Sequence, residues 1–245
     1  MTGRTPTVLY ILYTAMCAAA ACGGEKKAPN PSAAAVADTT QSKTAQLPPA
    51  AKSGGRPTIL FAGTSITAGL GLEPDSAYPM LIQRKIDSAS LPFEVTNAGV
   101  SGETSSGLLD RLDWLLRGNF RVLVVETGAN DGLRGIPAAT LRTNLSTILD
   151  RIKAKRPDAK VVVVQMEALP NLGPKYASDF HRVFPEVTNE KRVTLLPFLL
   201  ADVAGHRELN QGDGMHPNNK GEHIVADNVW RALRPVLDSV ASADK

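Results

Sequence analysis

The feature that most constrains this chain is a regular alternation of short apolar runs with longer amphipathic segments from Arg56 onward. The short runs are rich in Val, Ile and Leu and end near a glycine or a polar residue, as strands buried on both faces do. The longer segments repeat their apolar residues at helical spacing. Strands that alternate with helices predict a parallel sheet covered by helices on both faces.

The pattern predicts five strands and five helices. The clearest strand is the β-branched run at residues 161–164. The clearest helix spans residues 138–155, with its apolar residues on one face and Pro157 after its end. The other strands are expected at residues 58–62, 93–97, 121–126 and 193–196. The other helices are expected at residues 77–88, 108–116, 176–188 and 217–237.

The composition fits a globular domain and excludes several classes of protein. Hydrophobic residues make up 43% of the 245 residues and charged residues 21%, which excludes a wholly disordered chain, collagen and a coiled coil. The formal net charge of +3 is too small to predict a nucleic-acid partner. The two cysteines, Cys17 and Cys22, lie near the N-terminus. They provide neither a disulfide scaffold nor a thiolate zinc site.

The first 22 residues resemble an export signal. Residues 8–21 are apolar, too short a run to span a bilayer comfortably but typical of a signal peptide. Small residues precede Cys22 as in a bacterial lipobox, which predicts that Cys22 carries lipid and becomes the mature N-terminus. Ala19 stands where that motif usually has leucine, so a plain secretory signal is the alternative.

Residues 23–55 are expected to form a disordered tether. They are rich in Ala, Pro, Ser, Thr and Lys and contain no aromatic residue, so they cannot bury enough apolar surface to offset the entropy of ordering. The folded domain is then residues 56–245. Gly23 is not the aspartate that retains lipoproteins at the inner membrane. We therefore expect the outer membrane or the periplasm of a Gram-negative bacterium, with the lipid anchor as the membrane contact.

Three polar clusters directly follow the first three predicted strands, where parallel sheets bind ligands. Ser65 follows the first strand, where its hydroxyl could act as a nucleophile, although such a serine is more often a helix N-cap. Gly102 follows the second strand and would let the backbone approach a ligand, or lie in a flexible connector. Asn130 follows the third strand and could donate to a developing oxyanion, or form a turn with Asp131.

The fourth cluster precedes the last predicted helix. Gly214 permits a turn that folds Asp213 back on His216, and a carboxylate can hold one ring nitrogen while the other acts as a base. Pro217 suits the first position of the helix. A metal site would need more ligands, and no second His or Cys cluster supplies them. The remaining histidines are expected to be surface or structural residues; they are His181, His206 and His223.

Together the four clusters resemble the SGNH, or GDSL-like, hydrolase family, whose sequence blocks occur here in order. The matching blocks are residues 63–65, Gly102, residues 128–131 and residues 213–216. The resemblance covers about residues 57–238 and is nearest to the bacterial thioesterase/lysophospholipase/arylesterase branch. It implies an α/β fold of three layers, α/β/α, with a five-stranded parallel sheet of the flavodoxin-like kind.

The same resemblance implies roles for five residues. Ser65 would be the nucleophile, His216 the general base and Asp213 the residue that orients His216. The backbone N–H groups of Ser65 and Gly102 and the side-chain amide of Asn130 would form the oxyanion hole. The implied activity is hydrolysis of simple acyl esters, aryl esters or lysophospholipids, with thioesters as a further class, through an acyl-enzyme. No metal or cofactor is implied, and we expect a monomer that takes a small acyl-ester or lipid substrate.

Two alternatives stay open: a carbohydrate O-deacetylase of the cell envelope, and a non-catalytic envelope-binding lipoprotein. The second is supported by Thr64, which stands where the family has an aspartate beside its nucleophile. In the family that aspartate is not the proton-relay carboxylate but helps to order the turn that carries the nucleophile, so we expect activity that is reduced or retuned rather than absent. If the family's aspartate orders the turn that carries the nucleophile (residues 63–68, the nucleophile turn), Thr64→Asp should raise kcat.

Overall fold

The computed structural model describes residues 55–243. The predicted signal segment, the lipidation of Cys22 and the predicted tether up to residue 54 lie outside the described residues and stay predictions. Within residues 55–243, none of the helices combines the length and the apolar character that crossing a bilayer requires.

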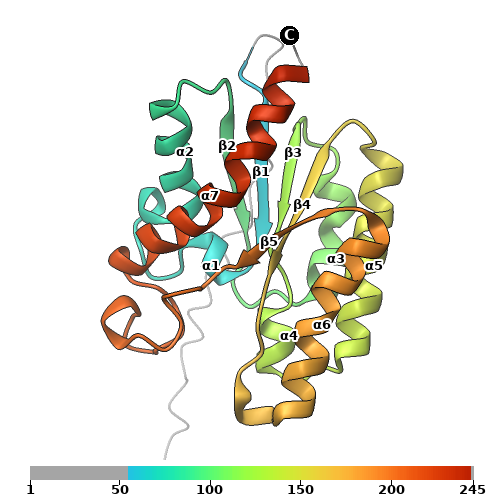
Figure 1. Ribbon diagram of the computed structural model, residues 1–245, viewed down its shortest axis with the longest axis vertical. Coiled ribbons are helices and arrows are strands. Elements are labelled where there is room, and N and C mark those ends of the chain that lie inside the picture. Colours follow the sequence, from blue (N-terminus) through green and yellow to red (C-terminus); the bar gives the residue numbers. More distant parts are fainter. Residues whose placement is uncertain (1–54, 244–245) are drawn as a thin grey trace, which may run out of the picture. The chain divides into compact units, whose positions relative to one another are not determined.

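One sheet of five parallel strands forms the centre of the described domain, as the sequence predicts (Figure 1). The strand order is β2-β1-β3-β4-β5, so β1 lies between β2 and β3. The central strands are almost entirely buried because helices cover both faces, which is why they read as continuous apolar runs. The strands are β1 (Thr58–Gly63), β2 (Glu94–Gly99), β3 (Val122–Val125), β4 (Lys160–Gln165) and β5 (Thr194–Phe198).

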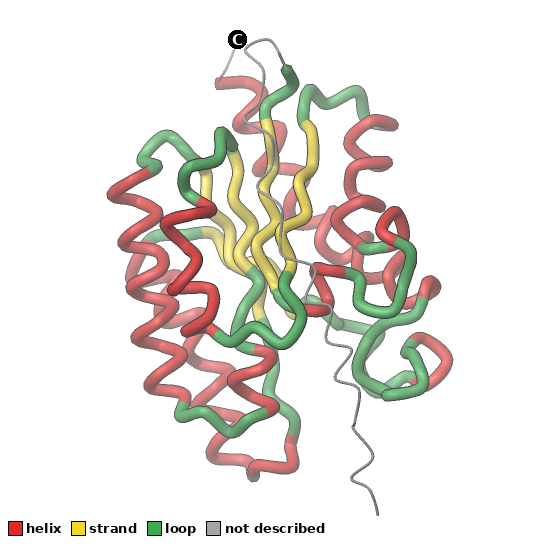
Figure 2. Tube along the Cα trace, turned by 180° about the vertical axis from the view of Figure 1, so that it is seen from behind, coloured by secondary structure: helices red, strands yellow, loops and turns green. Residues whose placement is uncertain are grey.

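The longer helices form two layers around this sheet, as Figures 1 and 2 show from opposite sides. Helices α2 (Tyr78–Ser88) and α7 (Asn219–Ala243) pack together on one face. The other face carries α3 (Ser105–Leu115), α5 (Ala138–Lys155) and α6 (Pro174–Lys191). Each helix buries an apolar stripe against the strands. Short elements complete the domain: α1 (Ser65–Ala68), α4 (Ala129–Leu133), and the 3-10 turns η1 (Pro74–Ser76), η2 (Pro170–Leu172) and η3 (Arg207–Leu209).

The start of α7 differs from the sequence-based expectation. The helix begins at Asn219 rather than at Pro217. The reason is the side chain of Asn218, whose Oδ1 accepts the backbone N–H groups of Lys220 at 3.0 Å and Gly221 at 3.2 Å. An asparagine that satisfies two free N–H groups fixes the helix start more firmly than a proline does.

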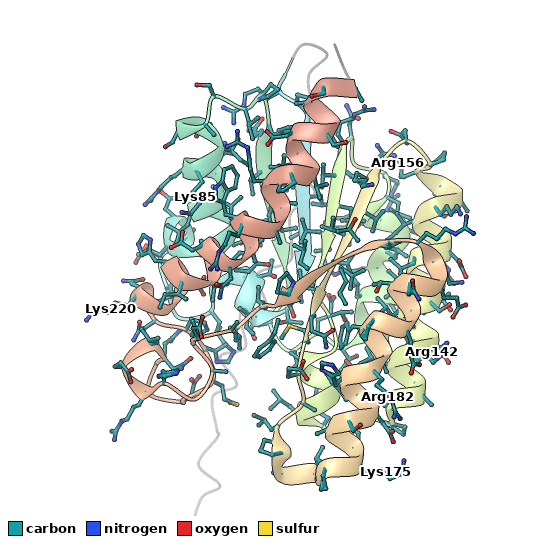
Figure 3. The ribbon with its side chains drawn as sticks, in the orientation of Figure 1. Lys85, Arg142, Arg156, Lys175, Arg182 and Lys220 are labelled. Atoms are coloured by element: carbon teal, nitrogen blue, oxygen red, sulfur yellow. The ribbon has the colours of Figure 1, made fainter. Side chains whose placement is uncertain are left out.

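The outer surface of α5 and α6 carries ion pairs. Arg142, Lys175 and Arg182, labelled in Figure 3, lie along these two helices. Arg142 pairs with Glu186 at 2.8 Å, and both Lys175 and Arg182 pair with Asp179 at 2.6 Å. Pairs of this kind between exposed side chains contribute little to stability.

Candidate active site

Ser65 lies where β1 turns into the one-turn helix α1, at the carboxyl end of the sheet. Thr64 is the N-cap of this helix and Ser65 its first residue, so Ser65 does not act as the cap. The Ser65 hydroxyl oxygen lies 2.8 Å from Nε2 of His216, 151 positions later in the sequence. The fold therefore brings the first and the fourth sequence clusters into hydrogen-bond contact.

The loop before α7 holds His216 by local hydrogen bonds. Oδ2 of Asp213 lies 2.6 Å from Nδ1 of the His216 ring. Oδ1 accepts the backbone N–H groups of Met215 at 2.9 Å and His216 at 3.0 Å, and Gly214 turns the chain with a φ of 71°. Hydrogen bonds from the His216 backbone, the His216 ring and the Met215 backbone lower the pKa of Asp213 to about 2. Asp213 is therefore ionised at neutral pH.

The third group of candidate residues lies in the loop after β2 and in α4. Gly102 has a φ of 78°, in the left-handed region that favours glycine. The side-chain amide of Asn130 donates to the backbone oxygen of Glu103 at 3.0 Å, which ties α4 to that loop. An asparagine amide carries two N–H groups, so one remains to donate to a ligand. Arg134 donates to the backbone oxygen of Gly102 at 2.9 Å.

The Asp131 side chain accepts hydrogen bonds from Ser105, at the start of α3, rather than forming a turn with Asn130. Its carboxylate is fully buried and accepts the backbone N–H of Ser105 at 2.8 Å and the Ser105 hydroxyl at 2.5 Å. These bonds attach α4 to the start of α3. They hold in place the two segments that carry Gly102 and Asn130.

Comparison with known proteins identifies the family. A model of the GDSL-like Lipase/Acylhydrolase family matches residues 61–224, which include the five residues expected in the triad and the oxyanion hole. The chain belongs to this family. Esterase TesA of Pseudomonas aeruginosa is 39% identical over 181 residues, which are 74% of this chain and 89% of that protein. Thioesterase 1/protease 1/lysophospholipase L1 of Escherichia coli is 34% identical over 182 residues, 74% of this chain and 85% of that protein.

The fold agrees with that assignment. A solved crystal structure of TesA matches this chain with a TM-score of 0.70 and 37% sequence identity, covering 73% of this chain and 99% of that one. The three-layer arrangement and the parallel five-stranded sheet are thus those of the SGNH hydrolases.

Thr64, where this chain departs from the family's sequence pattern, is bonded to a carboxylate that sequence reasoning missed. Glu126 directly follows β3, and its Oε2 accepts the Thr64 backbone N–H at 2.6 Å and the Thr64 hydroxyl at 2.9 Å. The same oxygen accepts the Thr67 hydroxyl at 3.0 Å. The one sequence signal is a glutamate directly after the apolar run of residues 122–125.

The most exposed large apolar side chains of the described domain lie in loops and single helical turns at the carboxyl end of the sheet, which carries the candidate site. They follow β1, β3 and β4 or lie next to His216. Isolated exposed apolar residues need no explanation, but several at one end of a domain suggest contact with an apolar ligand. They are Leu70, Leu133, Leu169, Leu172 and Met215.

The other histidines lie away from Ser65. The His181 ring, on α6, pairs with Glu167 at 2.7 Å, and His206 pairs with Glu208 at 3.4 Å. His223 lines a groove of about 510 Å³ between α2 and α7, which contains none of the candidate residues. Within residues 55–243, no group of three or more His, Cys, Asp or Glu side chains is arranged to hold a metal ion.

Proposed function

We propose that this chain is a carboxylic ester hydrolase in which Ser65 is the nucleophile. The observation that carries the proposal is the chain of hydrogen bonds from Asp213 to His216 to Ser65, at 2.6 and 2.8 Å. A buried or partly buried serine has no need of such a chain for folding. It is the arrangement that activates a hydroxyl for attack on an acyl carbon.

Acylation uses each of these groups in turn. The Ser65 oxygen attacks the carbonyl carbon of the ester while Nε2 of His216 takes its proton. Asp213, ionised at neutral pH, stabilises the imidazolium that forms. The backbone N–H groups of Ser65 and Gly102 and the free N–H of Asn130 donate to the developing oxyanion. His216 then gives its proton to the leaving oxygen or sulfur, and the acyl group remains on Ser65.

Deacylation repeats these steps with water. His216 takes a proton from a water molecule, which attacks the acyl carbon, and the same three donors receive the oxyanion. When the carbon–oxygen bond to Ser65 breaks, His216 returns the proton to the serine and the acid leaves. None of these steps requires a cofactor.

The proposed substrates are simple acyl esters, aryl esters and lysophospholipids, with thioesters as a further class. Two observations support this range. The relatives above 30% identity have names that refer to esters, thioesters and lysophospholipids. Exposed leucines in the segments that follow β3 and β4, such as Leu133 and Leu172, offer an apolar surface to an acyl chain. A monomer is sufficient for this chemistry, because the proposed catalytic groups come from one chain.

We further propose an exported lipoprotein anchored through Cys22, in the outer membrane or periplasm. The support is the apolar segment before Cys22 and the small residues next to it. Cys22→Ser should release the protein into the soluble periplasmic fraction. An unmodified mature N-terminus, seen by mass spectrometry in the wild type, would instead indicate a plain secretory signal.

Covalent labelling with a fluorophosphonate tests the proposed function. The wild-type chain should be labelled and should hydrolyse p-nitrophenyl esters, whereas folded Ser65→Ala should do neither. Measuring kcat/KM over p-nitrophenyl esters of increasing chain length, beside a lysophospholipid, then defines the acyl preference. A folded Ser65→Ala protein with unchanged turnover would refute the assignment. A wild-type protein inert to label and substrates would favour a binding role.

A further inference from the structure

Glu126 places a buried carboxylate directly beneath the turn that carries Ser65. Its Oε2 accepts the backbone N–H of Thr64 at 2.6 Å and the Thr67 hydroxyl at 3.0 Å. The Thr64 hydroxyl donates to the same carboxylate, 2.9 Å from Oε2 and 3.1 Å from Oε1. The hydrogen bonds to Glu126 thus come from the residues on either side of Ser65 and Ile66.

The end of β1 leaves room for this carboxylate. Glu126 lies across from Gly63, since its N–H donates to the backbone oxygen of Ala62 at 2.8 Å. A Cβ atom on Gly63 would lie 2.6 Å from Oε2 of Glu126 and 2.1 Å from the Thr67 hydroxyl. Both distances are far below a van der Waals contact. Glycine is therefore required here because the carboxylate and the threonine occupy the space of a side chain.

Burying a carboxylate at this position is costly. Glu126 is 1% exposed. Burial raises its pKa, while the hydrogen bonds from Thr64 and Thr67 lower it. An apolar side chain at the end of this apolar strand would avoid that cost. The hydrogen bonds that the Glu126 carboxylate accepts come from the nucleophile turn. The carboxylate therefore contributes to the geometry of that turn.

We propose that Glu126 is a positioning residue, whose carboxylate fixes the backbone of Thr64–Thr67 so that the Ser65 hydroxyl faces His216 and the Ser65 N–H faces the oxyanion. The inference rests on the proposed role of Ser65 as nucleophile. It also accounts for Thr64: a hydroxyl at this position donates to the carboxylate, whereas the aspartate of the family pattern would bring a second acceptor.

Glu126→Ala tests the proposal, because it removes the acceptor that Thr64 and Thr67 share and leaves the Thr64 N–H without a partner. We expect kcat to fall about 100-fold with KM within about threefold, since a small displacement of a nucleophile can cost that much rate. The rate constant for fluorophosphonate labelling of Ser65 should fall by the same factor. A loss that came from weaker substrate binding would raise KM instead.

Two further variants separate positioning from general destabilisation. Glu222 is buried to the same 1%, and its carboxylate accepts the Tyr78 backbone N–H at 2.7 Å. Glu222 accepts from the backbone N–H of Tyr78, whereas it is the Tyr78 hydroxyl that contacts the turn, 2.9 Å from the Thr67 hydroxyl. Tyr78 can keep that contact without the Glu222 carboxylate, so Glu222→Ala should keep kcat and labelling within about threefold, whatever its melting temperature. Glu126→Gln keeps an oxygen that accepts from the turn. It should recover at least about tenfold of the rate that Glu126→Ala loses.

Several outcomes would overturn the proposal. They are a folded Glu126→Ala protein whose kcat stays within twofold of wild type, an equal loss in Glu222→Ala, or no recovery in Glu126→Gln. If Glu126→Ala does not fold, Thr64→Val removes one donor at almost constant volume and should still slow labelling about fivefold. Unchanged labelling in folded Thr64→Val would then count against the proposal. An inert wild-type protein would instead contradict the proposed function.

Discussion

The nucleophile turn and the histidine loop meet at one hydrogen bond but are stabilised in opposite ways. The turn, residues 63–68, is buried except for the half-buried Ala68 and is held by Glu126, which lies 62 positions after Thr64. The loop, residues 211–218, is largely exposed and held by its own hydrogen bonds, such as that from the Gln211 N–H to the His216 oxygen at 2.7 Å. Changes in the turn should therefore affect folding and catalysis together, whereas changes in the loop should affect catalysis alone.

Asp213→Asn should have the largest effect on catalysis. An asparagine can still accept the backbone N–H groups of the loop, but it would donate to the His216 ring and stabilise the tautomer that cannot take the Ser65 proton. We expect kcat to fall roughly 10⁴-fold, as in other serine hydrolases with this change. The melting temperature should stay within about 2 °C, because the Asp213 side chain is 41% exposed.

Unfolding of Asp213→Asn would contradict the expectation that changes in the histidine loop affect catalysis alone. A large drop in melting temperature, measured by circular dichroism beside kcat, would show that the Asp213 contacts support the fold as well as the histidine. A kcat within tenfold of wild type would instead remove Asp213 from the proposed triad.

Gly63→Ala should have the next largest effect, and it should affect both stability and rate. The added methyl group would lie within 2.1 Å of the Thr67 hydroxyl and 2.6 Å of Glu126. We expect a loss of about 3 kcal/mol in the free energy of unfolding, a melting temperature lower by about 6–12 °C, and kcat about 100-fold lower. Urea unfolding and ester hydrolysis measure the two effects.

The matched control lies in the other region. Gly212, in the histidine loop, has no atom within 4 Å of the position a Cβ would take. Gly212→Ala should therefore change stability by less than about 0.5 kcal/mol and kcat by less than about threefold. If Gly63→Ala and Gly212→Ala changed the free energy of unfolding and kcat by similar amounts, the difference in burial would not explain how the two regions respond to substitution.

Thr64→Asp should have a smaller effect, in the direction opposite to the one that the family pattern suggested. The new carboxylate would lie against Glu126 in a site where Thr64 is 1% exposed. Two buried carboxylates cannot both ionise without cost. We expect kcat to fall about tenfold and the melting temperature by about 5 °C. Adding Glu126→Gln leaves one carboxylate in the pair and should recover at least about fivefold of the rate.

A rise in kcat with no loss of stability in Thr64→Asp would restore the original expectation. It would mean that the nucleophile turn gains more from an aspartate than it loses by repulsion with Glu126. The double variant would then be slower than Thr64→Asp, which is the reverse of the order predicted here.

The sequence predicts best what depends on neighbouring residues. The strands, the long helices and the histidine loop follow from local spacing, and the strands and helices begin and end within three residues of the expected positions, except that α7 runs six residues further, to Ala243. The one-turn helices α1 and α4 were missed because a single turn has too few residues to show a period. The start of α7 was misplaced because the side chain of Asn218 caps it.

The support of the nucleophile turn could not be predicted from the chain. Thr64 and Glu126 meet because β1 and β3 are neighbours in the sheet order, although β2 comes between them in sequence. The spacing of residues along the chain does not predict that β1 pairs with β3. The sequence therefore identified the residues proposed to carry the chemistry, but not the buried carboxylate beneath them, which requires the topology.

Glu222→Gln should have the smallest effect on catalysis, and it tests whether a buried carboxylate outside the nucleophile turn matters only for stability. Burial raises the pKa of Glu222 to about 8, while the Tyr78 N–H opposes the shift. In the unfolded chain a glutamate titrates near 4.3. Between those values the unfolded state has lost a proton that the folded state keeps, so the contribution is fully present below about pH 4 and is lost as pH rises toward 8.

The variant should therefore flatten the decline of stability with pH. One group can contribute a slope of at most about 1.4 kcal/mol per pH unit. Glu126, whose pKa is also raised, keeps a slope of the same sign in both proteins. Urea midpoints at pH 5 and pH 8 should differ less in Glu222→Gln than in the wild type, with kcat unchanged at both. An equal pH dependence in the two proteins would mean that Glu222 is ionised in the folded state. A fall in kcat would mean that the carboxylate at the start of α7 also acts on the active site, and the contrast with Glu126 would be lost.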